Sequence, residues 1–177
     1  MIVAIAGKRG VGKSTFANRL VSVYGFKKVS FADPLKLASE IIFPGIYTGM
    51  TLANKETPYF TKGETRRDFL IALGQLARYY DEMVWVKAAK LESYKTNVVV
   101  DDLRFKNEAE HLKKLGAKLV RIERYKKYNP FVGEISDISE IDLDEYKGFD
   151  MIVNEFNNET LFDLNKQVDK FIKDFVH

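Results

Sequence analysis

The chain begins MIVAIAGKRGVGKST, in which residues 1–6 are an apolar run and residues 7–14 a glycine-rich one. The apolar run has no alternation with polar residues, which predicts a strand buried on both faces, as in parallel sheets. Residues 7–14 match the pattern G-x-x-x-x-G-K-[ST]. Its glycines let the backbone curl until successive N–H groups converge on phosphate oxygens, and a helix that follows turns its positive end to the same place. The stretch therefore predicts a strand, a phosphate-binding loop and a helix.

This loop predicts the binding of a nucleoside triphosphate. We expect the Lys13 ammonium to act on the β and γ phosphates, and the Ser14 hydroxyl to bind Mg²⁺. The residues expected to hold ATP are Arg9, Gly10, Val11, Gly12, Lys13, Ser14 and Thr15. A glycine-rich turn with a solvated lysine is the alternative, but the strand before the loop and the helix after it make that coincidence rare. The reaction stays open, because such loops occur in switches, motors, helicases and small-molecule kinases.

Strands and helices alternate along the remaining chain. Apolar, β-branched segments predict four further strands, at residues 28–31, 97–101, 118–123 and 149–153. Apolar residues at helical spacing predict helices at about residues 16–24, 33–43, 66–80, 85–91, 105–115 and 160–175. Gly25 stands where a helix C-cap glycine belongs, and Asp33 followed by Pro34 is typical of a helix start. This order predicts an α/β domain with a mainly parallel sheet.

Composition limits the kind of protein. The 177 residues suit one globular domain, and 46% hydrophobic with 30% charged residues suit a packed core. The absence of cysteine excludes disulfides, cysteine-bound metals and thiol catalysis, and it favours a cytoplasmic setting. A net charge of +3 without a concentrated basic face predicts no nucleic-acid partner, and no apolar run is long enough to cross a membrane. Two histidines are too few for a multi-histidine metal site.

Two aspartates, Asp101 and Asp102, follow the apolar run Val98-Val99-Val100. A Mg²⁺-bound nucleotide needs a carboxylate at the end of a buried strand, directly or through water. Because strand residues alternate in direction, one aspartate would address the metal and the other an acceptor substrate. We place Asp101 with the metal and Asp102 with the substrate; the reverse order, or a plain turn or helix cap, stays open.

Together these motifs carry a resemblance that covers nearly the whole chain. Its segments, besides the loop, are Phe31-Ala32-Asp33-Pro34-Leu35-Lys36; Arg67 with Leu70, Leu73 and Gly74; Trp85-Val86-Lys87; Asp102-Leu103-Arg104-Phe105-x-Asn107-Glu108; and Ser139-Glu140 ahead of Asp150-x-x-x-Asn154. The chain resembles the deoxynucleoside monophosphate kinases of tailed bacteriophages, within the nucleoside monophosphate kinase group of P-loop proteins. The resemblance implies a five-stranded parallel sheet flanked by helices, a short acceptor-binding insertion at about 44–66 and a lid at about 124–148. It also implies phosphoryl transfer from ATP, with Mg²⁺, to a deoxynucleoside monophosphate.

The resemblance further implies roles for individual residues. Asp33 would be catalytic and, with Lys36, lie near the acceptor, while Arg67 would grip the monophosphate through its guanidinium. The remaining expected substrate-binding residues are Gly74, Trp85, Asp102 and Arg104, and Arg124 would be a catalytic lid arginine that reaches the γ phosphate.

Structural roles compete with several of these assignments. Asp33 is equally compatible with a helix N-cap, and Trp85 with a position in the core. Arg104 could hold substrate phosphate or balance the charges of Asp101 and Asp102. The other cations near the lid, Arg121, Lys126 and Lys127, fit a solvated charged face, and Ser139-Glu140 fits a helix cap.

Two positions depart from the family's pattern. Ile71 stands where relatives often carry glutamine, at a position expected to contact the base, so base preference stays open. Asp137 stands where relatives often carry histidine, so no role of that histidine carries over. Three other functions compete: a P-loop kinase for another phosphorylated acceptor such as dephospho-coenzyme A, an NTPase switch or motor, and a module that only binds ATP. We expect a small-molecule substrate and no membrane partner, and leave a homodimer open.

Overall fold

The computed structural model describes residues 1–48, 54, 57–123, 138–154 and 161–175. The chain forms two compact units. The first, here called the sheet unit, joins Met1–Ser30 with Glu92–His177. The second, the helical unit, is Phe31–Leu91. The predicted insertion at about 44–66 falls in the helical unit, and residues 124–137 of the predicted lid, with Arg124, lie outside the described residues.

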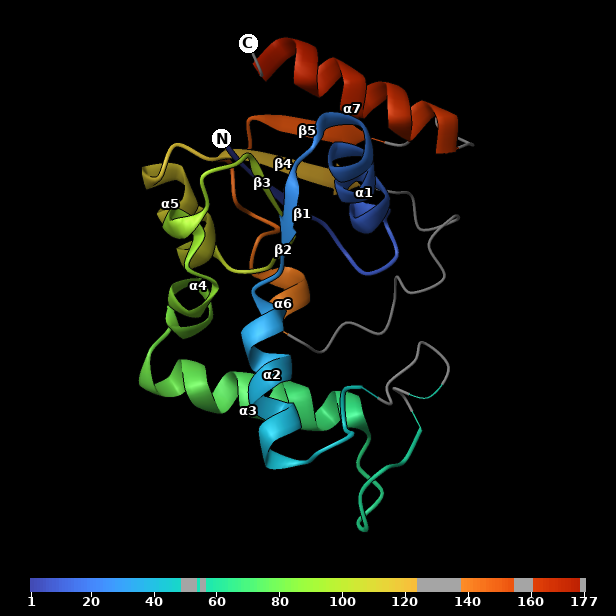
Figure 1. The fold of residues 1–177 in the computed structure, drawn as a ribbon, viewed down its shortest axis with the longest axis vertical. Coiled ribbons are helices and arrows are strands. Elements are labelled where there is room, and N and C mark those ends of the chain that lie inside the picture. Colours follow the sequence, from blue (N-terminus) through green and yellow to red (C-terminus); the bar gives the residue numbers. More distant parts are fainter. Residues whose placement is uncertain (49–53, 55–56, 124–137, 155–160, 176–177) are drawn as a thin grey trace. The chain divides into compact units, whose positions relative to one another are not determined.

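Five parallel strands form one sheet in the order β2-β3-β1-β4-β5 (Figure 1). They are β1 at Ile2–Ala6, β2 at Lys27–Val29, β3 at Val98–Leu103, β4 at Lys118–Glu123 and β5 at Met151–Asn154. In the centre, Val3 of β1 pairs with Val99 of β3 on one side and with Lys118 of β4 on the other. The predicted five-stranded parallel sheet is therefore confirmed. β3 is longer than expected, since it continues through both aspartates to Leu103.

Helices cover both faces of the sheet. They are α1 at Lys13–Tyr24, α5 at Lys106–Lys114, the short α6 at Ile138–Ile141 and α7 at Leu161–Phe175. The connection from β1 to β2 and the connection from β3 to β4 run in opposite directions across the sheet. Right-handed crossovers therefore place α1 and α5 on opposite faces, as Figure 1 shows. α7 packs on α1, where Arg19 holds both carboxylate oxygens of Asp169 at 2.8 and 2.7 Å.

The core of the sheet unit lies between the sheet and the pair α1 and α7. Its fully enclosed members include Val3 and Ile5 of β1, Phe16 of α1 and Phe171 of α7. The rings of Phe16 and Phe171 meet edge to face, with centroids 6.0 Å apart. α1 ends as predicted at Gly25, whose φ of 69° lets its N–H reach the carbonyls of the last turn. This packing fixes α1, and with it the loop that leads into α1.

Three helices make up the helical unit, together with the first residue of a short 3-10 turn at Leu91–Ser93. They are α2 at Ala32–Ile42, α3 at Arg66–Tyr80 and α4 at Val84–Ala89. A capping box starts α3: the Thr65 hydroxyl accepts the N–H of Asp68 at 3.1 Å, and the Asp68 carboxylate accepts the N–H of Thr65 at 2.8 Å. Phe43, Phe60 and Phe69 pack together beside this cap.

The expected N-cap role of Asp33 is wrong. α2 begins at Ala32, and Phe31 stands at the N-cap without a side-chain hydrogen bond. Asp33 therefore lies in the first turn, where a carboxylate still interacts favourably with the positive end of the helix. Pro34 fits there because the first N–H groups of a helix have no intrahelical partner to lose. Among the described residues, no helix is long and apolar enough to span a membrane.

Candidate active site

The glycine-rich loop between β1 and α1 needs glycine at its first position. Gly7 has a φ of 145°, and a Cβ placed on it would lie 2.4 Å from the carbonyl oxygen of Ile122 in β4. Gly12 then forms the N-cap of α1 in the left-handed region, at a φ of 107°, and makes no side-chain cap. The N–H groups of the first turn of α1 thus lack a capping side chain, which suits them to bind an anion.

Lys13 lies folded over this loop. Its ammonium donates hydrogen bonds to the carbonyl oxygens of Gly7 and Lys8 at 2.7 and 2.8 Å. These are the carbonyls of the loop's own first two residues, so the lysine side chain folds back across the loop. The ammonium has three N–H donors, and the two carbonyls each accept one hydrogen bond from it. They hold the ammonium at the loop, where the phosphate oxygens of a nucleotide are expected.

The pKa of Lys13 is lowered from 10.5 to about 8, chiefly by burial and also by the positive charge of Arg104. Three carboxylates, Glu140, Asp101 and Asp102, act in the opposite direction and favour the protonated lysine. The five side chains therefore interact electrostatically, although they come from α1, β3, α6 and the residue after β3. A lysine whose charged form is disfavoured by burial gains from any anion that binds beside it.

The two predicted metal ligands lie together. The Ser14 hydroxyl is 3.3 Å from Oδ2 of Asp101, within hydrogen-bond distance. A hydroxyl and a carboxylate are the hard oxygen donors that Mg²⁺ prefers, so the pair fits this ion, which in kinases neutralises charge on the nucleotide's β and γ phosphates. No cluster of three or more acidic or histidine side chains that could hold a metal occurs among the described residues. Nucleotide oxygens and water would have to complete the coordination of the ion.

Lys28 of β2 and Ser30, the residue after that strand, contact the two aspartates, and sequence reasoning did not single them out. The Lys28 ammonium is 2.6 Å from the same Oδ2 of Asp101 that faces Ser14. The Ser30 hydroxyl donates to Oδ2 of Asp102. The two aspartates thus have different partners, and Asp101 is the one on the Ser14 side. A strand order that places β2 beside β3 brings these residues together, which a single sequence does not reveal.

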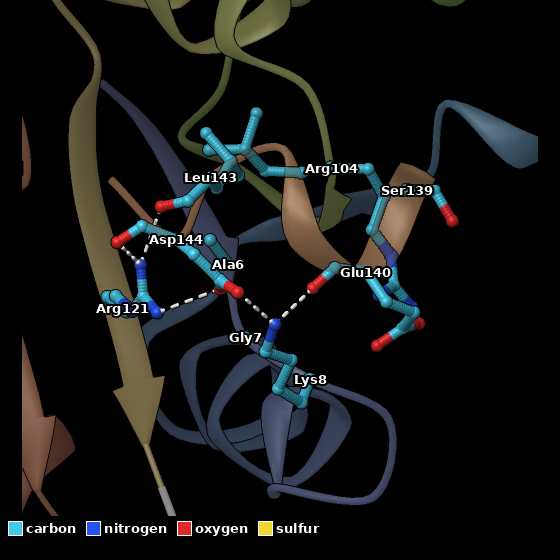
Figure 2. A pocket seen from close by; sticks show the side chains of 10 residues that line it. Ala6, Gly7, Lys8, Arg104, Arg121, Ser139, Glu140, Leu143 and Asp144 are labelled. Carbon is cyan, nitrogen blue, oxygen red and sulfur yellow. Dashed lines mark hydrogen bonds and ion pairs between the residues drawn. The ribbon is translucent and has the colours of Figure 1, made fainter. Parts of the chain in front are cut away.

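A short acidic segment around α6 is attached to the loop (Figure 2). The Glu140 carboxylate accepts the backbone N–H of Arg9 at 3.0 Å and lies 2.5 Å from the Arg104 guanidinium. The Lys8 ammonium donates to the backbone carbonyl of Glu140 and to the Asp144 carboxylate, the latter at 2.7 Å. Lys8 and Arg9 occupy the first two of the four variable positions of the motif, and both bind this segment.

Arg121 belongs to the same contact region, and the expectation of a solvated cation is wrong for it. Its side chain is only 15% exposed. The guanidinium donates to the Leu143 carbonyl at 2.6 Å and pairs with Asp144 and Glu123 at 3.3 and 2.8 Å. Arg121 lies on β4, beside β1, the strand that leads into the loop. Its partners Leu143 and Asp144 lie more than twenty residues further along the chain, and Glu123 lies two residues along the same strand. Lys126 and Lys127 lie outside the described residues.

In the helical unit, the predicted acceptor residues of α2 form a local group. The Lys36 ammonium pairs with the Asp33 carboxylate at 2.9 Å and stands 5.2 Å from the centre of the Tyr47 ring. Tyr47 is held in turn by Glu40, whose carboxylate accepts the N–H of Tyr47 at 2.8 Å. Sequence reasoning missed Tyr47 and Glu40. The signal that pointed to them was their short distance from Lys36 along the chain.

The remaining predicted acceptor residues lie on α3 and α4. Arg67 is half-buried in the first turn of α3, and its charge helps to lower the pKa of Asp68. The neighbouring Arg66 stacks on Tyr59, with its guanidinium carbon 3.8 Å from the ring centre. Trp85 is 7% exposed and donates its indole N–H to the carbonyl of Gly74 at 3.3 Å. Of the two roles open to Trp85, the structure shows packing in the core.

Solved structures of other proteins share this fold at low identity. Shikimate kinase of Aquifex aeolicus superposes with a TM-score of 0.54 at 16% identity, over 98% of this chain and 97% of that one. Dephospho-CoA kinase of Campylobacter jejuni gives a TM-score of 0.52 at 16% identity, over 98% and 96%. Shikimate kinase of Acinetobacter baumannii gives 0.53 at 16% identity, over 99% and 95%. The fold and the glycine-rich loop define a protein of the P-loop class.

A closer relative in sequence narrows this class. A protein of Acanthamoeba polyphaga mimivirus, described as "Putative deoxynucleotide monophosphate kinase", is 30% identical over 191 residues. The alignment covers 95% of this chain and 94% of the viral protein. The chain belongs to the family of this viral kinase. No family model matches the chain.

Proposed function

We propose that this P-loop kinase transfers the γ-phosphoryl group of ATP to the 5′-phosphate of a deoxynucleoside monophosphate. The observation that carries the proposal is the alignment over nearly the full length of both chains with the viral relative, whose description is that of a deoxynucleotide monophosphate kinase. The arrangement of Lys13 and of the Ser14–Asp101 pair supports the ATP half of the reaction, because it offers a cation for phosphates and oxygen donors for Mg²⁺.

The reaction joins two phosphorylated molecules, so its main physical obstacle is charge repulsion. An oxygen of the acceptor phosphate bonds to the γ phosphorus, while the bond from that phosphorus to the β–γ bridging oxygen breaks and ADP leaves with the electron pair. The protein contributes positioned cations rather than covalent chemistry. Lys13 would serve the nucleotide phosphates, and Arg67 the acceptor phosphate, with Asp33 and Lys36 orienting the acceptor.

An acceptor panel tests this function directly. Release of ADP and formation of a diphosphate would be measured with dTMP, dGMP, dCMP, dAMP, their ribonucleotide forms and dephospho-coenzyme A. We expect a deoxynucleoside diphosphate from at least one deoxynucleotide. Transfer to dephospho-coenzyme A alone, or ATP hydrolysis without any phosphorylated product, would contradict the proposal.

The role of Arg67 has its own test. Replacing Arg67 by Ala should raise the acceptor KM on the order of 10- to 100-fold while the ATP KM changes little, because a charge-assisted contact to one substrate is lost. Arg78→Ala, a charge removed from the last turn of the same helix, is the matched control. Equal changes in both KM values for Arg67→Ala would place the acceptor phosphate elsewhere.

A further inference from the structure

Both oxygens of the Glu140 carboxylate are engaged at the loop. Oε1 lies 2.5 Å from Nη1 of Arg104, and Oε2 accepts the Arg9 N–H at 3.0 Å. The Glu140 side chain is 13% exposed, so the pair is shielded from water and from salt. The carboxylate thus joins the main chain of the loop to the guanidinium of an arginine that lies nearly a hundred residues further along the chain.

Arg104 is also fixed at its other end. The backbone N–H groups of Arg104 and Phe105 donate to Oε2 of Glu108, at 3.1 and 3.2 Å. Glu108 is 1% exposed and belongs to the first turn of α5. The main chain of Arg104 is therefore held by the buried Glu108 carboxylate and its guanidinium by the Glu140 carboxylate. Because a long side chain loses rotamer freedom when it is held, this double restraint points to a need for one fixed guanidinium position.

That position is close to Lys13. Arg104 lines one pocket with Gly7 and Lys8 (Figure 2), the two residues whose carbonyl oxygens hold the Lys13 ammonium. Two cations held together repel each other when no anion is present. A polyanion between them would turn the repulsion into attraction on both sides, and the nucleotide phosphates bound by the loop are such a polyanion.

We propose that Glu140 is a positioning residue for phosphoryl transfer: its carboxylate, anchored on the Arg9 N–H of the loop, holds the Arg104 guanidinium beside Lys13 to meet the phosphate oxygens. Arg104 would then act on the nucleotide side of the reaction. This role differs from the acceptor role and the charge-balancing role expected from the sequence. The inference needs the phosphoryl transfer of a P-loop kinase and does not depend on which acceptor is used.

The neighbouring Asp142 supplies a matched control. Its carboxylate accepts the N–H of Lys106 at 2.6 Å and so ties the same acidic segment to the start of α5 rather than to the loop. Glu140→Gln keeps the side-chain length and an oxygen that accepts the Arg9 N–H, but loses the charge that holds Arg104. We expect Glu140→Gln to lower kcat on the order of 10- to 100-fold, the cost of a misplaced catalytic group. Asp142→Asn should lower thermal stability at most and leave kcat within about two-fold.

The split between kcat and KM separates positioning from simple attachment of the segment. In Glu140→Gln we expect kcat to fall while the KM for ATP stays within about two-fold, because the loop keeps its own binding groups and only the Arg104 guanidinium is misplaced. A KM for ATP that rises as much as kcat falls would mean that Glu140 holds the loop itself, and it would overturn the proposal.

The double variant completes the test. If Glu140 acts through Arg104, then Glu140→Gln in the Arg104→Gln background should cause little further loss of kcat. Losses that multiply, a Glu140→Gln variant as active as the unmodified chain, or one that fails to fold would each overturn the proposal and leave Glu140 as a structural residue. The acceptor panel on the unmodified chain comes first. Should no deoxynucleotide accept phosphate, the same variants are compared on whichever acceptor does, or on ATP hydrolysis.

Discussion

The sheet unit and the helical unit are stabilised by contacts of very different range. Side-chain contacts at the loop join residues far apart in sequence: Ser14 with Asp101, Lys8 with Asp144, and Arg19 with Asp169 on the adjoining helix. In the helical unit the side-chain ion pairs and hydrogen bonds are local, as between Asp33 and Lys36 or Thr65 and Asp68, and the longer-range contacts are packed rings such as Phe43 and Phe69. A site built from distant residues depends on the whole fold of its unit.

The two units also differ in how deeply their apolar side chains are buried. Among the described residues, the helical unit has its most exposed ones at Ile41, 75%, Tyr79, 82%, and Tyr80, 81%. The central strand of the sheet unit is fully buried, with Val3 and Ile5 at 0%. Substitutions should therefore cost most where the loop meets the sheet and least in the locally built helical unit, and the following predictions test that difference.

The largest effect is expected for Lys13→Ala. It removes the buried cation that stabilises charge on the transferred phosphoryl group, so kcat should fall on the order of 1000-fold. The thermal unfolding midpoint should change little, because burial already disfavours the charged lysine. The exposed Lys95→Ala is the control. Near-normal phosphoryl transfer by Lys13→Ala would contradict the assignment of the loop.

A pair of glycine substitutions compares the two units directly. Gly7 and Gly63 both have a positive φ, at 145° and 93°, but a Cβ meets the Ile122 carbonyl at 2.4 Å in the first case and open space in the second. Chemical unfolding should show that Gly7→Ala costs about 3 kcal/mol or more and Gly63→Ala about 1 kcal/mol. Equal losses would mean that the close approach of the loop to β4 does not affect the free energy of unfolding.

The depressed pKa of Lys13 also predicts how stability changes with pH. Between about pH 8 and 10.5 the unfolded chain keeps the lysine proton that the folded chain has lost. The unfolded state then binds more protons, so this residue makes the free energy of unfolding rise with pH across that window. The rise should be smaller in Lys13→Met, measured by urea unfolding at pH 7.5 and pH 9.5. Identical slopes in both proteins would show that the lysine has an ordinary pKa.

The smallest effect is expected in the helical unit, for Thr65→Ala. This change removes the N-cap hydroxyl of α3 and should lower the free energy of unfolding by about 1 kcal/mol. Thr65→Ser retains the hydroxyl and should restore most of the loss. A loss as large as that of Gly7→Ala would remove the contrast between the two units.

Local patterns predicted the fold well, for physical reasons. Strand β1 and helix α1 follow from an unbroken apolar run and from apolar residues at helical spacing, and Gly25 ends α1 because a left-handed residue is needed there. The start of α2 was misplaced at Asp33 because an acidic residue before a proline suits the first turn as well as the N-cap.

The candidate site was predicted only in part. The loop motif singled out Lys13 and Ser14, and the end of a buried strand singled out Asp101. The attachment of Glu140 to Arg9 has no periodic or compositional signal, since it joins residues 131 apart through one side chain. Arg121 looked like one of several exposed cations until β4 placed it beside Leu143 and Asp144.

The central place of β1 has a consequence for the timescale on which the loop keeps its shape. β1 pairs with a strand on each side, and Val3 to Ala6 are 0% exposed. Their amide hydrogens should exchange with solvent only when the whole unit unfolds, whereas the amides of α6 should exchange through local opening. The phosphate-binding loop should thus directly follow the strand whose amides exchange most slowly, whereas Glu140, the positioning residue for Arg104, lies in a helix whose amides should exchange early.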